Sequence, residues 1–128
     1  MEKEHLNQLG KQILNASIAV HREMGHGLLE SVYEKCLMKE FELREISVQN
    51  QVQIPLLYKG YRLRNEFRID LLVEDEIIIE IKSAEQMHPV YEAQLISYLK
   101  LSGKQLGYLI NFNVPLLKDG FKRFVDDF

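Results

Sequence analysis

The stretch that decides the fold is Arg68-Ile69-Asp70-Leu71-Leu72-Val73-Glu74-Asp75-Glu76-Ile77-Ile78-Ile79-Glu80-Ile81-Lys82. Two apolar runs rich in β-branched residues flank a charged tripeptide, a pattern typical of two strands joined by a tight turn. If the hairpin is centred on Asp75, Asp70 and Glu80 face each other across the two strands. The alternate residues Ile69, Leu71, Val73, Ile77, Ile79 and Ile81 then form a core stripe on the opposite face.

Asp70 and Glu80 form the chemically unusual pair of this hairpin. Directly opposed side chains have Cβ atoms roughly 4.5–5.5 Å apart. Two carboxylates about 5 Å apart repel by roughly 3 kcal/mol at an effective dielectric constant of about 20. A divalent cation between them reverses the sign of that interaction, and Mg²⁺ prefers one or two carboxylates while keeping waters on its other positions. The pair therefore indicates a candidate metal site.

Lys82 lies two residues beyond Glu80 and shares its face of the strand. A metal-activated water can attack a phosphodiester, and a lysine ammonium can orient that water or the scissile phosphate. The pattern Glu-x-Lys is also common on solvated strand faces, so the triplet is informative only together with the opposed Asp70.

The rest of the chain predicts a mixed sheet with helices packed on it, an α/β (α+β) fold in the order α-α-β-β-β-α-β with a further terminal strand. We expect a single domain over residues 1–128. Expected helices cover about residues 6–24, 30–44 and 90–101, and expected strands cover 48–58, 61–73, 77–82, 106–112 and 121–125. A turn at Lys59-Gly60 joins the first two strands.

Composition excludes several classes of protein. Hydrophobic residues make up 46% and charged residues 27% of the 128, so the chain is neither disordered nor collagen-like. The single cysteine, Cys36, has no internal disulfide partner, and no apolar run is long enough to span a membrane. We expect a soluble cytoplasmic protein. A net charge of −3 means that nucleic-acid binding needs a local basic patch.

A second motif lies upstream: Gly27-Leu28-Leu29-Glu30-Ser31-Val32-Tyr33 has the form G-x-x-E-x-x-Y. With Asp70 and Glu80-Ile81-Lys82 downstream, the chain resembles the GxxExxY family, a branch of the PD-(D/E)XK nuclease superfamily. The resemblance covers about residues 13–125 and includes Gly107-Tyr108-Leu109-Ile110-Asn111-Phe112. It implies a restriction-endonuclease-like core, a central mixed sheet flanked by helices.

The resemblance also implies roles for particular residues. Asp70 and Glu80 would bind Mg²⁺ or Mn²⁺ together with the backbone carbonyl of Ile81, and Lys82 would be the catalytic lysine. Glu30 would be the acidic residue, and a metal ligand, that related nucleases supply from an early helix. Gln94 and Tyr98 match a Q-x-x-x-Y motif that lies beside the site in exonuclease-like branches, so they would be catalytic-site residues that support metal waters or the nucleic acid. One departure from the family pattern is visible, because Ile69 rather than proline precedes Asp70, although that proline is often absent in the superfamily.

The residues of these motifs also have structural interpretations. Glu30 in the first turn of a helix interacts favourably with the helix dipole, by less than about 1 kcal/mol. Tyr33 reads as a core tyrosine with a hydrated hydroxyl. Gln94 and Tyr98, four residues apart on one helix face, are compatible with plain packing.

The densest positive stretch supplies a candidate nucleic-acid surface. Arg62, Arg64 and Arg68 share parity with Asp70, so an unbroken strand would place all three on the face of the carboxylates. Such a row can track a phosphate backbone, and an ordinary charged strand surface is the alternative. Lys100 and Lys104 could extend the patch, although solvation alone accounts for them.

The leading hypothesis is a Mg²⁺- or Mn²⁺-dependent nuclease, a hydrolase acting on nucleic acid, with DNA favoured over RNA as the substrate. The alternative is a catalytically silent module of the same fold that binds nucleic acid or a protein partner, and a purely structural subunit is a third. The small size leaves a homodimer or a protein partner open. The sequence does not settle DNA against RNA, single against double strands, or endonuclease against exonuclease action.

Overall fold

The computed structural model describes residues 2–128 and is built around a five-stranded mixed sheet in the order β1-β4-β5-β6-β7. The strands are β1 (Val48–Gln53), β4 (Arg68–Val73), β5 (Ile77–Lys82), β6 (Leu106–Asn111) and β7 (Phe121–Val125). Only the β5–β6 pair is parallel, and the helix α3 (Pro89–Ser102) makes the crossover between these two strands. The predicted α/β fold with a central mixed sheet and a terminal strand is confirmed.

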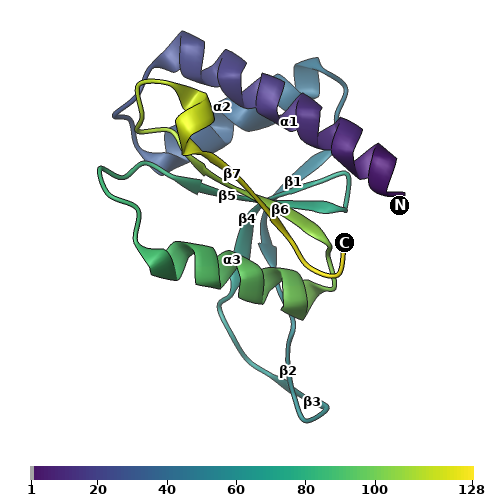
Figure 1. The fold of residues 1–128 in the computed structure, drawn as a ribbon. Helices are drawn as coiled ribbons and strands as arrows, with labels where there is room; N and C mark the ends of the chain where they lie inside the picture. Colours follow the sequence, from purple (N-terminus) through teal and green to yellow (C-terminus); the bar gives the residue numbers. More distant parts are fainter. Residues whose placement is uncertain (1) are drawn as a thin grey trace.

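Helices cover both faces of the sheet (Figure 1). On one face lie α1 (Lys3–Met24) and α2 (Glu30–Leu43), with the short 3-10 helix η1 (Leu117–Gly120), and on the other lies α3. None of the helices in residues 2–128 is long and apolar enough to cross a membrane. His88 caps α3, because its Nδ1 accepts a hydrogen bond from the Val90 amide, and Pro89 occupies the first turn.

Two hydrophobic clusters separate these layers. The larger one joins α1 and α2 to the sheet residues Leu71, Val73, Ile77, Ile79 and Ile81. The smaller one joins α3 to Ile69, Leu72, Ile78 and Leu109. Gly107 of β6 allows the close approach of α3, because a Cβ at this position would lie 3.0 Å from Leu95 Cδ1 and 3.3 Å from the Ile78 carbonyl oxygen.

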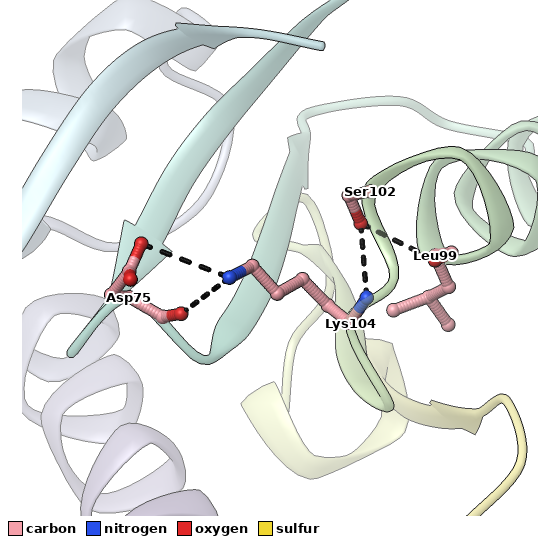
Figure 2. A network of polar contacts seen from close by, with 4 residues as sticks. All are labelled: Asp75, Leu99, Ser102 and Lys104. Atoms are coloured by element: carbon pink, nitrogen blue, oxygen red, sulfur yellow. Dashed lines mark hydrogen bonds and ion pairs between the residues drawn. The ribbon is translucent and has the colours of Figure 1, made fainter. Parts of the chain in front are cut away.

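The predicted β4–β5 hairpin has the expected register, with Leu71 opposite Ile79 and Leu72 opposite Ile78. Glu74 and Asp75 both have positive φ, 52° and 57°, which are the two left-handed positions of a type I′ turn. The turn is tied down by Lys104, whose Nζ donates to the Asp75 carbonyl oxygen at 2.8 Å (Figure 2). Lys104 therefore lies against the turn of this hairpin and does not extend a basic patch toward the carboxylates.

The expectation of long strands over residues 48–58 and 61–73 is wrong. The chain forms β1 and β4 in the main sheet and, beyond a break, a separate two-stranded hairpin of β2 (Leu56–Tyr58) and β3 (Tyr61–Leu63). Pro55 has no amide to donate, and the Asn65 side chain accepts the Phe67 amide at 2.7 Å in a local turn. Residues 54–55 and residues 64–67 lie outside the strands at this break. The alternation of side chains between the two faces of a strand therefore does not continue across it.

Candidate metal centre

The two acidic residues of the hairpin contact each other just beyond the end of the β4–β5 ladder. The last paired residues are Leu71 and Ile79. One step further on, Oδ2 of Asp70 accepts the Ile81 amide at 2.8 Å, and the Asp70 amide donates to Oε1 of Glu80 at 3.4 Å. Where the strands separate, these two carboxylates accept the hydrogen bonds that backbone carbonyls accept within the ladder. Asp70 and Glu80 are close together, as the register of the hairpin predicted.

A local irregularity accompanies this separation. Gln51 is the β1 residue opposite Asp70, and it has a left-handed φ of 52° and does not join the β1–β4 ladder. Ile69 packs in the cluster beneath α3, although strict alternation places it with Leu71 on the other face. The predicted single-face stripe is therefore wrong at Ile69, because the strand changes its course at Asp70.

Glu80 is the most perturbed acid in the structure. Its side chain is buried, with 7% of the residue exposed. Burial, followed by the charge of Asp70 and a side-chain hydrogen bond with it, raises the pKa of the Glu80 carboxyl from 4.5 to about 9. Without a cation, the pair therefore holds a proton at neutral pH, since two adjacent carboxylates resist joint ionisation.

Lys82 extends from the end of β5 on the same side as Glu80. Its positive charge lowers the pKa of Glu80, in opposition to burial and Asp70. The ammonium lies 4.4 Å from the centre of the Tyr91 ring in α3, a cation–π contact. Within residues 2–128, no carboxylate forms an ion pair with Lys82 inside 4.0 Å, so the ammonium is available to a phosphate or a water.

Tyr98 and Gln94 lie in the layer between α3 and the sheet. Tyr98 is buried, and its hydroxyl accepts a hydrogen bond of 2.8 Å from the exposed Gln94. Burial raises the pKa of the Tyr98 hydroxyl, and the nearby charge of Glu80 raises it further. Tyr98 thus lies near enough to Glu80 to respond to its charge, and Gln94 is attached to the Tyr98 hydroxyl.

Asp70 opens onto a pocket of about 370 Å³ lined by Glu30, Ser31, Glu34, Gln51, Asp70 and Ile81. Glu30 is the exposed first residue of α2, and Glu34 lies one turn further along that helix. The side chain of Gln51 connects Glu34 to Asp70, because its Nε2 donates hydrogen bonds of 2.8 and 3.4 Å to their respective carboxylates. Sequence reasoning missed Glu34 and Gln51, although the spacing of four from Glu30 placed Glu34 on the same helix face.

These side chains do not form an acidic cage. Across residues 2–128, no group of three or more His, Cys, Asp or Glu side chains is arranged to hold a metal ion. Glu30 therefore shares the pocket with Asp70 without completing a three-acid cluster. The donors that the structure brings together are the two coupled carboxyls, and oxygen ligands of this kind suit a hard cation that retains most of its waters.

Tyr33 gives the G-x-x-E-x-x-Y motif a structural meaning. Its ring is fully buried and stacked on Phe112 at 4.4 Å between centroids. Its hydroxyl donates to the Gly25 carbonyl at 2.6 Å and accepts from the Leu28 amide at 3.2 Å, so the expectation of a hydrated hydroxyl is wrong. Gly27 has a φ of +92°, a conformation that side chains rarely adopt. Tyr33 and Gly27 thus fix the loop that leads into Glu30.

Replacing Tyr33 by phenylalanine is expected to lower the free energy of unfolding by about 1–2 kcal/mol. The loss leaves the Gly25 carbonyl and the Leu28 amide without their shared partner. Urea denaturation measures the change, and Tyr61→Phe on an exposed tyrosine is the matched control. Equal stability of Tyr33→Phe and wild type would show that the hydroxyl does not hold the loop.

Asn111 and Ser83 are further positioning residues that the sequence did not reveal as such. The buried Asn111 side chain accepts the Ala84 amide at 3.1 Å and donates to the Ala84 carbonyl at 3.0 Å. Ser83 Oγ donates to the Leu28 carbonyl at 2.5 Å. The segment after Lys82 is therefore attached both to β6 and to the loop before α2. The sequence signal for Asn111 was its position as a polar residue at the end of the otherwise apolar strand β6.

The three arginines predicted to bind nucleic acid lie in two different places in the structure. Arg68 begins β4, two residues before Asp70. Arg62 and Arg64 lie beyond the break in the strand and line a different pocket, with Gln53 and Asn65. The parity argument that placed all three on the face of the carboxylates is thus wrong for Arg62 and Arg64, because it required an unbroken strand.

The sequence model described as the PD-(D/E)XK nuclease superfamily matches residues 7–124. The chain belongs to this superfamily. The match includes both strands of the central hairpin, and the mixed sheet with two N-terminal helices and a crossover helix is consistent with the superfamily's restriction-endonuclease-like core. No curated protein and no solved structure matches the chain significantly.

Proposed function

We propose that the chain is a Mg²⁺- or Mn²⁺-dependent nuclease that hydrolyses phosphodiester bonds in nucleic acid, DNA rather than RNA. The observation that carries this proposal is the coupled Asp70–Glu80 pair at the point where β4 and β5 separate. Membership of a nuclease superfamily supports the reaction class. The motif residues Gly27, Glu30 and Tyr33 support a finer assignment to the GxxExxY branch.

The donor set fits a hard divalent cation. Asp70 and Glu80 would hold it with the backbone carbonyl of Ile81. Burial and the charge of Asp70 raise the pKa of Glu80 to about 9 although Lys82 opposes them, and a bound cation would favour the ionised pair. When bound, the cation supplies charge neutralisation at the phosphate and a more acidic water. Glu30 lines the same pocket as Asp70, where its carboxylate would accept hydrogen bonds from waters on a bound ion.

The remaining roles belong to side chains around the pair. Lys82 orients the attacking water or a phosphate oxygen, with its ammonium held against Tyr91. Tyr98 excludes water from Glu80, and Gln94 fixes the Tyr98 hydroxyl. Arg68, close along β4, neutralises a phosphate of the bound strand.

The test is cleavage of end-labelled single- and double-stranded DNA and RNA with Mg²⁺, with Mn²⁺ and with EDTA. Wild type is expected to cleave only with a divalent ion, and Asp70→Asn is expected to be inactive. Asp119→Asn, an exposed aspartate in η1, is the matched control and should keep full activity.

Two results of this assay contradict the proposal. Equal cleavage by wild type and Asp70→Asn identifies a contaminating nuclease. No cleavage by wild type under any condition favours the alternative, a silent nuclease-fold module that binds nucleic acid or a protein partner.

A further inference from the structure

The β2–β3 hairpin, residues 56–63, forms an arm that projects away from the main sheet (Figure 1). Its turn residues Lys59 and Gly60 have φ values of 50° and 83°, the left-handed pair of a tight type I′ turn. None of the arm residues belongs to either hydrophobic cluster. The arm therefore adds nothing to the core, and its side chains are free to contact another molecule.

The arm exposes large apolar side chains. Leu57 is 60% exposed, Tyr58 58% and Tyr61 73%. Tyr58 pairs with Tyr61 directly across the two strands, so both rings leave the same face of the ribbon beside the turn. The cross-strand pair stabilises the ribbon by no more than about 1 kcal/mol, and exposed aromatic residues gathered in this way mark a binding surface.

The arm and the segment that leads from it into β4 carry a charge opposite to that of the rest of the molecule. Residues 56–68 hold four basic side chains, Lys59, Arg62, Arg64 and Arg68, and one acidic side chain, Glu66. The segment thus carries +3, and since the whole chain carries −3, the remainder carries −6. None of the ion pairs within 4.0 Å among residues 2–128 involves these four basic groups. Lys59 lies over the Tyr58 ring at 5.5 Å from its centroid, an exposed cation–π contact that leaves its charge unneutralised. Positive charge without carboxylate partners on a negative body selects a polyanion.

The base of the arm is hollowed. A pocket of about 350 Å³ there is lined by Gln53, Pro55, Arg62, Leu63, Arg64 and Asn65. Its lining residues 62–65 lie between Tyr61 and Asp70 along the chain, and the nine residues from Tyr61 to Asp70 span at most about 32 Å. A strand of a few nucleotides spans that interval.

We propose that the arm binds single-stranded nucleic acid, with unpaired bases stacked on Tyr58 and Tyr61 and phosphates on Lys59, Arg62 and Arg64, and leads the strand to the Asp70–Glu80 site. Aromatic rings stack on any unpaired base, whereas the bases of a duplex are already stacked on each other. Delivery of the strand to the Asp70–Glu80 site rests on the proposed function, whereas binding of single strands by the arm is independent of it.

The test is fluorescence anisotropy of a labelled DNA of about 20 nucleotides, single-stranded or in a duplex, in EDTA so that no cleavage occurs. Wild type is expected to bind the single strand at least about five times more tightly than the duplex. Tyr58→Ala/Tyr61→Ala is expected to weaken single-strand binding tenfold or more, whereas Tyr58→Phe/Tyr61→Phe retains it. Arg62→Ala/Arg64→Ala is expected to reduce the slope of log affinity against log salt by about 1.4.

The controls and contrary results are equally specific. Lys11→Ala/Lys118→Ala removes the same charge from α1 and η1, and binding should be nearly unchanged. Tighter binding of duplex, no binding by wild type, or unaffected binding by the tyrosine variant overturns the proposal. So does a wild-type dimer that becomes monomeric in the tyrosine variant by sedimentation, since the arm would then serve a second copy. Binding of the single strand without any metal-dependent cleavage would support the binding role of the arm and contradict the proposed hydrolysis.

Discussion

Replacing Glu80 by glutamine is expected to stabilise the metal-free protein at pH 8 by on the order of 3 kcal/mol. Burial and the charge of Asp70 raise the pKa of the Glu80 carboxyl to about 9, against an ordinary 4.5. Between pH 4.5 and about pH 9, the Glu80 carboxyl keeps its proton in the folded protein and releases it in the unfolded chain. The stability associated with Glu80 is therefore complete below about pH 4.5 and is lost as the pH rises toward 9. Glutamine is neutral throughout and removes this loss.

Urea denaturation in EDTA at pH 5, 6.5 and 8 measures the effect. The difference between Glu80→Gln and wild type should be small at pH 5 and grow steadily with pH. Glu85→Gln, at an exposed carboxylate, is the matched control and should follow wild type. Parallel pH profiles for Glu80→Gln and wild type would mean that Glu80 is ionised in the folded protein. A residue that destabilises the resting protein in this way is typical of a functional site.

Replacing Lys82 by alanine is expected to lower the rate of hydrolysis by about 10²–10³-fold while leaving metal binding intact. The reason is geometric, since Lys82 lies two residues beyond Glu80 and its ammonium rests on Tyr91 without a carboxylate partner within 4.0 Å in residues 2–128. Asp70→Asn is expected to lose both hydrolysis and metal binding. Single-turnover cleavage separates the rate from substrate affinity.

Lys100→Ala, on an exposed position of α3, is the matched control for Lys82 and should cleave at the wild-type rate. Loss of metal binding in Lys82→Ala would show that the lysine holds the carboxylates in place. An unchanged rate in Lys82→Ala would remove it from the reaction.

Alternation and turn chemistry were enough to predict the central hairpin. The apolar runs around Glu74-Asp75-Glu76 specify the register because a shift by one residue would bury Asp70 and Glu80 among the isoleucines. The same argument brought Asp70 next to Glu80, in agreement with the structure. Element boundaries marked by Pro89 and Gly103 were also accurate, since both residues have strong backbone preferences.

Features that depend on distant partners were beyond the sequence. The break at Pro55 and Asn65 separates the arm from the sheet, and only the Asn65 side-chain bond to Phe67 makes it visible. The left-handed Gln51 and the pocket contact of Glu34 follow from tertiary packing rather than from local propensity. The two partners of the Tyr33 hydroxyl lie in the loop before α2, where no periodicity points to them.

The central claim is that the Asp70–Glu80 pair holds a divalent cation, and calorimetric titration with Mn²⁺ at pH 7.5 tests it most directly. Wild type and Lys82→Ala are expected to bind one ion per chain, and Asp70→Asn is expected to bind none. Asp119→Asn should behave as wild type. Equal Mn²⁺ binding by Asp70→Asn and wild type, or no binding by wild type, would contradict the account.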